Sequence, residues 1–201
     1  MLIVISGPSG CGKTTLVKRV IPEVHDLAFS VSFTTRKKRN SEIEGKDYYF
    51  VSEDEFKRMI KKHDFVEWAR VHEHYYGTSF SEIEEKETKN GLILDVDIQG
   101  ARQIRMYDPN AKLIFIFPPE FKELKKRLFR RGDETLESIE KRLKVAKIEI
   151  QCYTEFDYVI INDRLEEAVD NLLTLISSSS RLVEIPREKI AAILKSFSVE
   201  E

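Results

Sequence analysis

Residues 7–15 read Gly-Pro-Ser-Gly-Cys-Gly-Lys-Thr-Thr, which fits the phosphate-binding pattern of Gly, four residues, Gly, Lys and then Ser or Thr. The glycines allow backbone conformations of positive φ, which turn N–H groups inward around an anion. Lys13 adds a positive charge, and the Thr14 hydroxyl is placed to hold a magnesium ion. A helix that begins near Lys13 would offer its positive end to the same phosphates. The pattern therefore predicts a loop that binds the phosphates of a nucleotide.

The residues on either side of this loop support that interpretation. Residues 2–5 form a continuous apolar run, which is typical of a parallel strand buried on both faces. Residues 15–20 follow at helical spacing, and Pro22 predicts the end of that helix. The alternative is an ordinary glycine-rich turn with a solvated lysine. The order of strand, loop and helix favours the phosphate loop, because its mechanism requires that order.

The composition limits the class of protein. The chain has 201 residues and 41% hydrophobic residues, enough for one globular domain with mobile insertions. Charged residues make up 34%, but the net charge is only -2, so no overall field favours nucleic acid or an acidic membrane. No apolar run is long enough to cross a bilayer and the N-terminus carries no signal sequence, so we expect a cytoplasmic location. Cys11 and Cys152 lack the spacing of a metal site or disulfide framework and are expected to be thiols.

A basic loop and a set of short strands follow the first helix. Residues 29–33 alternate like a strand and lead to Arg36 and Arg39, which could form a second anion site; a solvated charge run is the alternative. Ser52 should cap a helix together with Glu55. Glu67 interrupts the apolar run of the next strand, and a buried carboxylate is costly without donors. Glu67 therefore points either to solvent or to a ligand.

The second half of the chain returns to buried strands and ends in helices. Residues 91–100 return to the main sheet with an apolar strand that ends in Asp95 and Asp97. A period of two would place both carboxylates on one face near the ligand-binding edge; a helix N-cap plus a solvent-facing acid is the alternative. Further core strands are predicted at residues 112–117 and 158–161. Helices are expected over residues 52–60, from Ser79 or Ser81 onward, and over residues 121–132, 133–152, 165–176 and 186–197.

The basic helices at residues 121–152 allow two interpretations. Cations near a helix C-terminus are favourable for dipole reasons alone, whereas beside a phosphate loop a basic helical hairpin is also typical of a closing lid. Residues 177–180 are a plausible joint to the last helix. The sequence leaves open whether that tail docks on the core, contacts another subunit or stays loose.

Several ordered motifs together resemble the guanylate kinase family over about residues 2 to 176. They are GPSGCGKTT, SVSFTTR with Arg39 three residues later, EGKDYYF, FVEWA, YYGT, LILDVDIQG, the RRGDE segment and VIIND. The resemblance implies an α/β fold: a parallel sheet of the P-loop NTPase type flanked by helices, with a small mixed α/β GMP-binding insertion and a helical lid. The corresponding boundaries are residues 1–31 and 81–176 for the P-loop core, 32–80 for the insertion, 126–143 for the lid within the core span, and 177–201 for the tail.

The resemblance also implies the roles of individual residues. GMP would be bound by Ser32, Arg36, Arg39, Tyr48, Glu67, Tyr76, Gly77, Thr78 and Asp97. ATP would be bound by Gly7, Pro8, Ser9, Gly10, Cys11, Gly12, Lys13, Thr14, Thr15, Asn162 and Asp163. The residues with catalytic roles would be Lys13, Arg36, Arg131 and Arg142, with Arg127 as a further lid arginine. Thr14 would hold Mg²⁺ together with phosphate oxygens.

The reaction implied is Mg²⁺-dependent transfer of a phosphoryl group from ATP to GMP, giving ADP and GDP. The predicted partners are ATP and GMP, with dGMP as a further candidate, no nucleic acid and no membrane; a monomer and a homodimer remain open. Two alternatives are a guanylate-kinase-like protein-interaction module and a P-loop kinase for another phosphorylated substrate. Lys13, Thr14, Arg131 and Arg142 argue against the first. Ser32, Glu67 and Thr78 argue against the second.

The chain departs from the family pattern in two places. Lys38 stands where many members have proline between the two arginines, so we expect greater mobility in the loop before Arg39. The tail beyond Ser177 has no counterpart that the motifs assign.

Overall fold

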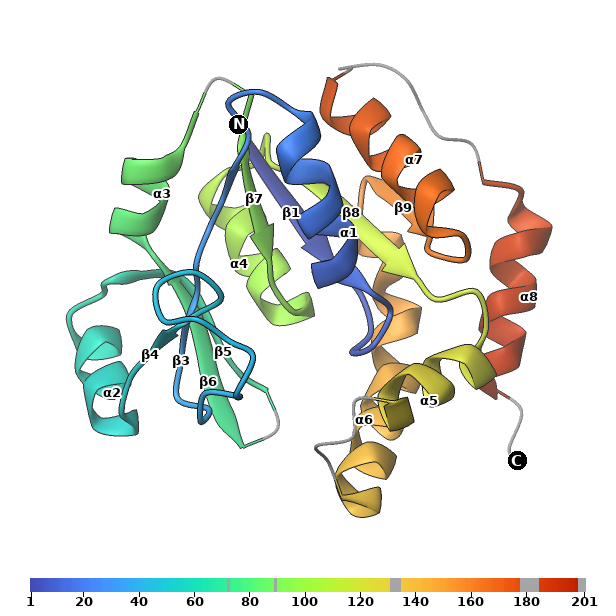
Figure 1. Cartoon of the computed structure of the whole chain (residues 1–201), viewed down its shortest axis with the longest axis horizontal. Coiled ribbons are helices and arrows are strands. Elements are labelled where there is room, and N and C mark those ends of the chain that lie inside the picture. Colours follow the sequence, from blue (N-terminus) through green and yellow to red (C-terminus); the bar gives the residue numbers. More distant parts are fainter. Residues whose placement is uncertain (72, 89, 131–134, 178–184, 199–201) are drawn as a thin grey trace. The chain divides into compact units, whose positions relative to one another are not determined.

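The computed structural model describes residues 1–71, 73–88, 90–130, 135–177 and 185–198 (Figure 1). The contacts divide the chain into two compact units. Unit 1 consists of Met1–Val4 and His25–Lys112, and unit 2 consists of Ile5–Val24 and Leu113–Glu201. The predicted GMP-binding insertion, residues 32–80, falls wholly within unit 1. The predicted domain boundaries differ from this division by contacts and stay predictions.

The strands form two sheets. One has five strands in the order β2-β7-β1-β8-β9, and the other has four in the order β4-β3-β6-β5. β1 covers Leu2–Ser6, and all five of its residues are buried, as the apolar run predicts. The parallel sheet flanked by helices that the sequence predicts is therefore confirmed (Figure 1).

Unit 1 contains the whole four-stranded sheet. Its elements are β2 (Ala28–Phe29), β3 (Phe33–Thr34), β4 (Tyr49–Phe50), α2 (Glu53–Lys61), β5 (Phe65–Val71), β6 (His74–Ser79), α3 (Phe80–Lys86), β7 (Leu92–Asp95) and α4 (Ile98–Tyr107). β5 and β6 pair antiparallel, and β3 pairs antiparallel with β6 and parallel with β4. Rings of Phe56, Phe65 and Tyr75 stack in the core between α2 and this sheet, with centroids 4.4 and 5.4 Å apart.

Two predictions for unit 1 need correction. The alternating stretch at residues 29–33 is two strands in different sheets, because the Val31 N–H donates to the Glu82 carboxylate instead of to a neighbouring strand. The strand that begins after Gly91 ends at Asp95, so the alternation of side chains between the two faces of a strand does not extend to Asp97. Asp97 is instead the N-cap of α4, where its side chain accepts from the Gly100 N–H at 2.8 Å.

The helix starts in unit 1 follow the predicted caps. The Ser52 hydroxyl accepts from the Glu55 N–H at 3.1 Å at the start of α2. Of the two candidates for the next helix, Ser79 is the N-cap, and it accepts from the Glu82 N–H at 3.2 Å. Local side-chain caps thus fix where both helices begin.

Unit 2 holds the phosphate-loop motif and the C-terminal half of the chain. Its elements are α1 (Lys13–Val20), the 3₁₀ turn η1 (Ile21–Glu23), β8 (Lys112–Phe117, from its second residue), α5 (Phe121–Arg130), α6 (Leu136–Glu149), η2 (Ile150–Glu155), β9 (Tyr158–Ile161), α7 (Leu165–Ser177) and α8 (Arg187–Ser198). β8 and β9 pair in parallel, and Ile114 to Phe117 are completely buried. The helix predicted for residues 133–152 is shorter, because it tightens into the 3₁₀ geometry of η2 after Glu149. Residues 131–134 lie outside the described part of the chain.

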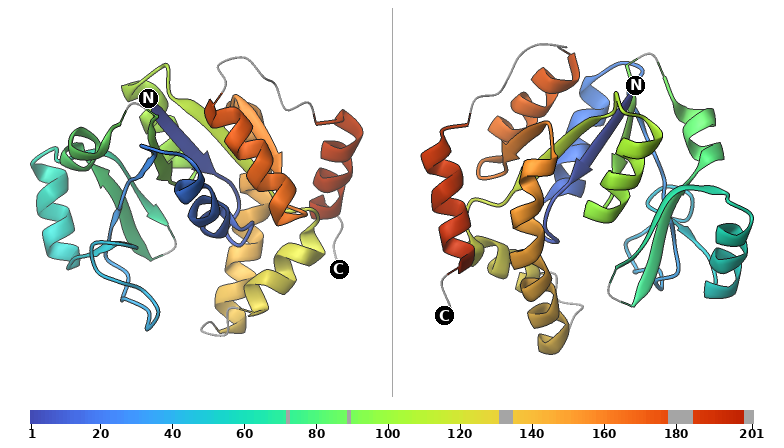
Figure 2. Two further views of the ribbon diagram at one scale, coloured as in Figure 1. Left: turned by 45° about the horizontal axis from the view of Figure 1, so that its top comes forward. Right: turned by 180° about the vertical axis from the view of Figure 1, so that it is seen from behind.

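The last helix docks within unit 2. α8 lies beside α5 in Figure 1 and in both views of Figure 2. The rings of Phe121 and Phe197 meet edge to face with centroids 5.1 Å apart, and Phe197 is 2% exposed. The Ser196 hydroxyl accepts from the Phe121 N–H at 3.0 Å. Of the three possibilities that the sequence leaves open for the tail, docking on the core is the one observed.

Candidate functional site

The phosphate loop of unit 2 has the backbone that its glycines predict. Gly7, Gly10 and Gly12 all have positive φ, at 142°, 91° and 97°. A Cβ on Gly7 would stand 2.3 Å from the Ile116 carbonyl oxygen, and one on Gly12 would stand 2.3 Å from the side-chain nitrogen of Asn162. No other residue fits these two positions without displacing its neighbours.

The end of α1 is suited to an anion. α1 begins at Lys13, its N-cap is Gly12, and its first turn contains neither a side-chain cap nor an acidic residue. The N–H groups of a first helical turn and the positive end of the helix dipole favour an anion at this position. The Lys13 ammonium donates to the Gly7 carbonyl at 2.7 Å, so its charge stays with the loop. Thr14 and Thr15 are exposed on this first turn.

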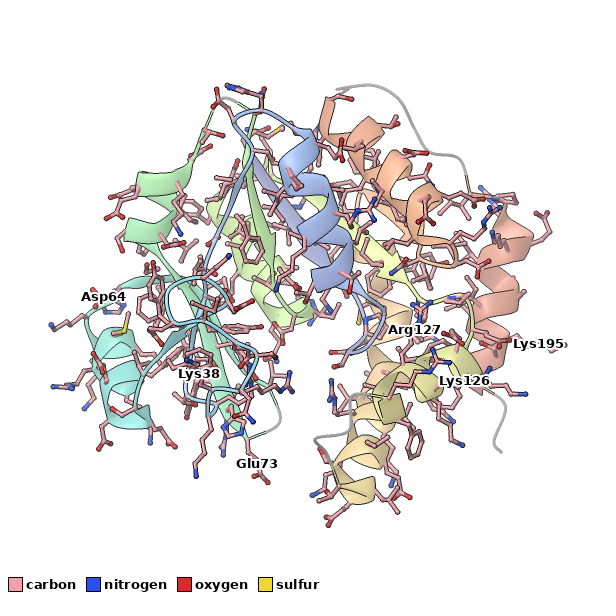
Figure 3. The ribbon with its side chains drawn as sticks, viewed as in Figure 1. Lys38, Asp64, Glu73, Lys126, Arg127 and Lys195 are labelled. Carbon is pink, nitrogen blue, oxygen red and sulfur yellow. The ribbon has the colours of Figure 1, made fainter. Side chains whose placement is uncertain are left out.

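Three side chains from other elements of unit 2 brace the loop. The Cys11 carbonyl accepts from the Asn162 side-chain amide at 2.8 Å and from Arg127 Nη1 at 3.2 Å. Arg127, which is labelled on α5 in Figure 3, also donates to the Asn162 carbonyl and is held by Glu123 at 3.1 Å. Arg142 of α6 is buried and donates to the Ser9 hydroxyl. The predicted ATP residues Ser9, Cys11 and Asn162 are thus linked to two of the predicted lid arginines.

Unit 1 contains a cluster of buried polar side chains around Glu67. This side chain is 3% exposed and accepts a hydrogen bond from the Thr78 hydroxyl at 2.7 Å, and the Ser32 hydroxyl lies 3.3 Å from Thr78. The β-bulge between Phe65 and Glu67 changes the direction of the strand where Glu67 occurs. The opposite carboxyl oxygen of Glu67 abuts α4, since a Cβ on Gly100 would lie 2.5 Å from it.

Burial and the neighbouring polar side chains change the pKa of Glu67. Burial raises the pKa of the Glu67 carboxyl, the Thr78 hydrogen bonds lower it, and the charge of Asp97 raises it, which leaves the pKa at about 8. Of the two possibilities predicted for Glu67, solvent exposure is excluded. A buried carboxyl group with a raised pKa and polar neighbours is typical of a ligand site.

The predicted anion site of unit 1 is formed by the loop after β3. The Arg36 guanidinium lies 5.3 Å from the Tyr48 ring and 5.8 Å from the Phe50 ring, and the rings of Tyr48 and Tyr76 are 6.0 Å apart. Burial lowers the pKa of the Arg36 guanidinium, but the Glu42 carboxylate and Tyr76 raise it by more than burial lowers it. The net pKa is raised, so the guanidinium stays charged. Figure 3 shows Lys38 on the same loop, and Lys38 is exposed.

Sequence reasoning missed Glu42, which is the main partner of this arginine. Glu42 accepts from Arg36 Nη2 at 2.7 Å and Nη1 at 3.0 Å, and from the Arg39 N–H at 2.8 Å. The available signal was an acidic residue three positions after Arg39 in an otherwise basic loop. The bracing contacts of Asn162 and Arg127 were also missed, because nothing local to those residues indicates contact with Cys11.

The structure places the remaining predicted residues as follows. All nine predicted GMP residues belong to unit 1, and all predicted ATP residues belong to unit 2. Gly77 is buried in β6, and Asp163 is exposed directly after β9. Arg131 lies outside the described residues, so the structure gives no position for it.

Within the described part of the chain, no three His, Cys, Asp or Glu side chains are grouped closely enough to hold a metal ion. In the same residues, no helix combines the length and apolar character needed to span a bilayer.

Comparison with known proteins gives a consistent family. A family model described as guanylate kinase matches residues 1–179. A guanylate kinase of Caldanaerobacter subterraneus subsp. tengcongensis is 45% identical over 177 residues, covering 88% of this chain and 86% of its own length. One from Thermotoga maritima is 41% identical over 191 residues, covering 94% and 92% of the two chains.

Two further matches extend through the tail. A guanylate kinase of Helicobacter pylori is 44% identical over 201 residues and covers 98% of this chain and 97% of its own. The crystal structure of a guanylate kinase from Anaplasma phagocytophilum superposes with a TM-score of 0.70 at 30% identity, covering 100% of this chain and 96% of that one. The tail beyond Ser177, to which the motifs assign no counterpart, therefore has one in these relatives.

Proposed function

This chain belongs to the guanylate kinase family and is a guanylate kinase, and from that premise we propose how its residues transfer a phosphoryl group from ATP to GMP. The observation that carries the proposal is the buried carboxyl group of Glu67 beside the hydroxyls of Thr78 and Ser32. In this assignment the polar cluster of unit 1 binds the acceptor nucleotide. The phosphate loop of unit 2 binds the donor.

The polar cluster suits guanine better than adenine. Guanine presents adjacent N1–H and N2–H donors, which the Glu67 carboxylate can accept as a pair, and the Ser32 hydroxyl can donate to O6 while the Thr78 hydroxyl keeps its bond to Glu67. Adenine has an acceptor at N1, which would face the carboxylate. Each buried polar group left unpaired costs about 1 to 3 kcal/mol. Sites that depend on such hydrogen bonds can reject the wrong partner by about 10⁴-fold.

The Asp97 side chain has a double role in this assignment. It caps α4, and its charge is close enough to Glu67 to raise the pKa of that carboxyl. We assign it to the guanine-binding set because one carboxyl oxygen caps the helix and the other accepts a long bond of 3.2 Å from Gln99. The helix cap would then also fix the position of a nucleobase ligand.

The phosphate of GMP belongs at the aromatic and basic end of unit 1. Arg36, Arg39, Tyr48 and Tyr76 supply cations and hydroxyl donors for a phosphomonoester. This phosphate is an anion at neutral pH, so it can attack without a general base. The residues around it would act by alignment and by neutralising charge.

The donor phosphates belong in the loop of unit 2. The N–H groups of the loop, the start of α1 and Lys13 would hold the β and γ phosphates. The exposed hydroxyl of Thr14 is the hard oxygen ligand that Mg²⁺ prefers, and it occurs on the turn where the phosphates would bind. Bound Mg²⁺ would neutralise phosphate charge. Asn162 and Asp163 are proposed for the adenine end of ATP.

Arginines would neutralise the negative charge on the phosphoryl group during its transfer. Arg142, which already contacts Ser9 of the loop, and Arg131 are proposed to stabilise that group, with Arg127 keeping the loop carbonyl of Cys11 in place. Exclusion of water would prevent hydrolysis of ATP. A cytoplasmic location and the use of dGMP stay predictions.

The direct test is ADP production with ATP and Mg²⁺, comparing GMP, dGMP, AMP, CMP and UMP, with the variant Lys13→Ala as control. We expect turnover with GMP that depends on Lys13, with kcat/KM for AMP lower by about 10⁴-fold. Equal use of AMP would contradict the role of Glu67. A folded protein without turnover on any nucleotide would instead favour the protein-interaction alternative.

A further inference from the structure

The Arg36 guanidinium of unit 1 has part of its hydrogen-bonding capacity committed to the protein. Its Nη1 donates to the Lys37 carbonyl at 2.7 Å and to Glu42 at 3.0 Å, and its Nη2 donates to the other oxygen of Glu42 at 2.7 Å. A guanidinium has five N–H donors. Three of the five are thus held by neighbours from its own loop.

The two remaining donors form one edge of the guanidinium. Since Glu42 spans the end formed by Nη1 and Nη2, the Nε–H and the second hydrogen of Nη2 form the opposite edge of the guanidinium as a parallel pair. Such a pair matches two oxygens of a phosphate or carboxylate. Tyr76, one of the residues proposed to bind the acceptor phosphate, hydrogen-bonds to the Arg36 guanidinium, so the phosphate would meet the two side chains together.

Glu42 is itself held firmly. Its second oxygen also accepts from the Arg39 N–H at 2.8 Å, its own N–H donates to the Arg39 carbonyl at 3.1 Å, and its side chain is 13% exposed. The next turn is closed by the Ile43 N–H, which donates to Asp47 at 2.9 Å. The carboxylate is therefore a fixed part of the loop and not a mobile surface charge.

The aromatic rings limit the remaining freedom of the guanidinium. Tyr48 and Phe50 lie 5.3 and 5.8 Å from its central carbon, while the Arg36 N–H donates to the Thr34 hydroxyl at 3.2 Å. A long side chain normally loses rotamer freedom when it binds a ligand, which costs about 0.5 to 1.5 kcal/mol. Here that freedom is already restricted.

We propose that Glu42 is a positioning residue for GMP: it fixes Arg36 from one end so that the opposite edge of the guanidinium is presented to the acceptor phosphate. This rests on the proposed placement of that phosphate at Arg36. Glu42 lowers the local positive charge, so its contribution is orientation and not attraction. A carboxylate that merely competed with the phosphate would have the opposite effect on GMP affinity.

The test compares GMP with guanosine, which lacks the phosphate, by calorimetric titration without ATP. We expect Glu42→Gln and Glu42→Ala to weaken GMP binding by about tenfold, since one oriented charge-assisted bond of this kind is worth about that factor. Guanosine affinity should stay within about twofold. The KM for GMP should rise by the same factor as the dissociation constant, whereas kcat at saturating GMP should change by less than about threefold.

Glu44→Gln is the matched control, because it removes the same charge from the same loop but its carboxylate contacts the Phe50 N–H and not the arginine. It should leave both affinities unchanged. Unchanged or tighter GMP binding in Glu42→Gln would overturn the proposal, as would an equal loss of guanosine binding, which would indicate a structural role.

Arg36→Ala separates this inference from the site assignment on which it rests. It should weaken GMP binding without changing the affinity for guanosine. If Arg36→Ala weakens GMP binding selectively and the Glu42 variants do not, Arg36 binds the phosphate but Glu42 does not position it. If Arg36→Ala has no effect on GMP binding, the phosphate binds elsewhere, and both the phosphate site at Arg36 and the positioning role of Glu42 are wrong.

Discussion

At the scale of single residues, Glu67 shows how function can work against stability. A carboxyl group with 3% exposure has few compensating partners beyond Thr78, and burial disfavours its charged form. The sequence could identify this residue as anomalous, because it interrupts an apolar strand. It could not decide between solvent and ligand, since the bulge that directs the side chain inward depends on pairing with β6.

The raised pKa of Glu67 predicts that GMP binding depends on pH. Guanine donors require the carboxylate, whereas with a pKa of about 8 the Glu67 carboxyl is mostly protonated at neutral pH before GMP binds. The ionised fraction falls from about 0.76 at pH 8.5 to about 0.09 at pH 7.0, so GMP affinity should fall about eightfold over that range. Titrations in buffers of different ionisation enthalpy should detect the release of about 0.9 proton per GMP bound at pH 7.0.

Glu67→Gln is the control for this pH effect, and it also tests the sign of the stability change. Because the folded pKa lies above the unfolded value of about 4.5, the stability associated with protonated Glu67 is fully present below pH 4.5 and is lost as the pH rises through 8. At pH 8.5 Glu67→Gln should therefore be more stable than the parent, by on the order of a few kcal/mol, while GMP binding is weak and no longer pH-dependent between pH 7.0 and 8.5. A parent protein whose GMP affinity is constant over this range would contradict the raised pKa.

At the scale of elements, the sequence predicts best where the signal is local. β8 and β9 occur at the predicted residues, and Ser52 and Ser79 cap the helices that follow them. The alternation at residues 29–33 misleads, because the partner that ends the ladder, Glu82, is about fifty positions away. Asp97 fits both a strand pattern and a helix cap, and only the end of β7 at Asp95 decides between them.

The last helix is another element whose place could not be read from the sequence. α8 is amphipathic, but its docking depends on Phe121 and Phe197, which are distant in the chain. Ser196 bonds to the first N–H of α5, and α5 carries the Arg127 that braces the phosphate loop. The tail therefore stabilises an element that contributes to the proposed donor site.

Ser196→Ala should weaken the start of α5. A lost helix-capping hydrogen bond costs about 1 kcal/mol, so denaturant unfolding should show a loss of that size, and hydrogen exchange should show lower protection of the Phe121 amide. Ser198→Ala is the matched control, because the Ser198 hydroxyl bonds within α8, to the Leu194 carbonyl. Equal changes in the two variants at the Phe121 amide would show that Ser196 does not cap α5.

At the scale of the whole molecule, the predicted site residues divide by unit. Ser32, Arg36, Glu67 and Thr78 belong to unit 1, whereas the phosphate loop and Asn162 belong to unit 2. The motifs identified both sets because each is short and depends on local backbone geometry, as in the positive φ of Gly12. The contact of Asn162 with Cys11 requires the folded chain and has no local signal, whereas the contact of Glu42 with Arg36 has only a weak one, an acidic residue in a basic loop.

This division predicts that a substitution can weaken the binding of one nucleotide without changing the affinity for the other. Glu67→Ala removes the guanine acceptor in unit 1 and should weaken GMP binding at least about a hundredfold, with ATP affinity unchanged within about twofold. Lys13→Ala, in unit 2, should weaken ATP and leave GMP unchanged when each nucleotide is titrated alone. Both variants should lose turnover, because phosphoryl transfer needs both nucleotides. Loss of both affinities in either variant, in a protein that still melts cooperatively, would mean that the two sites are not independent and that Glu67 does not act on guanine alone.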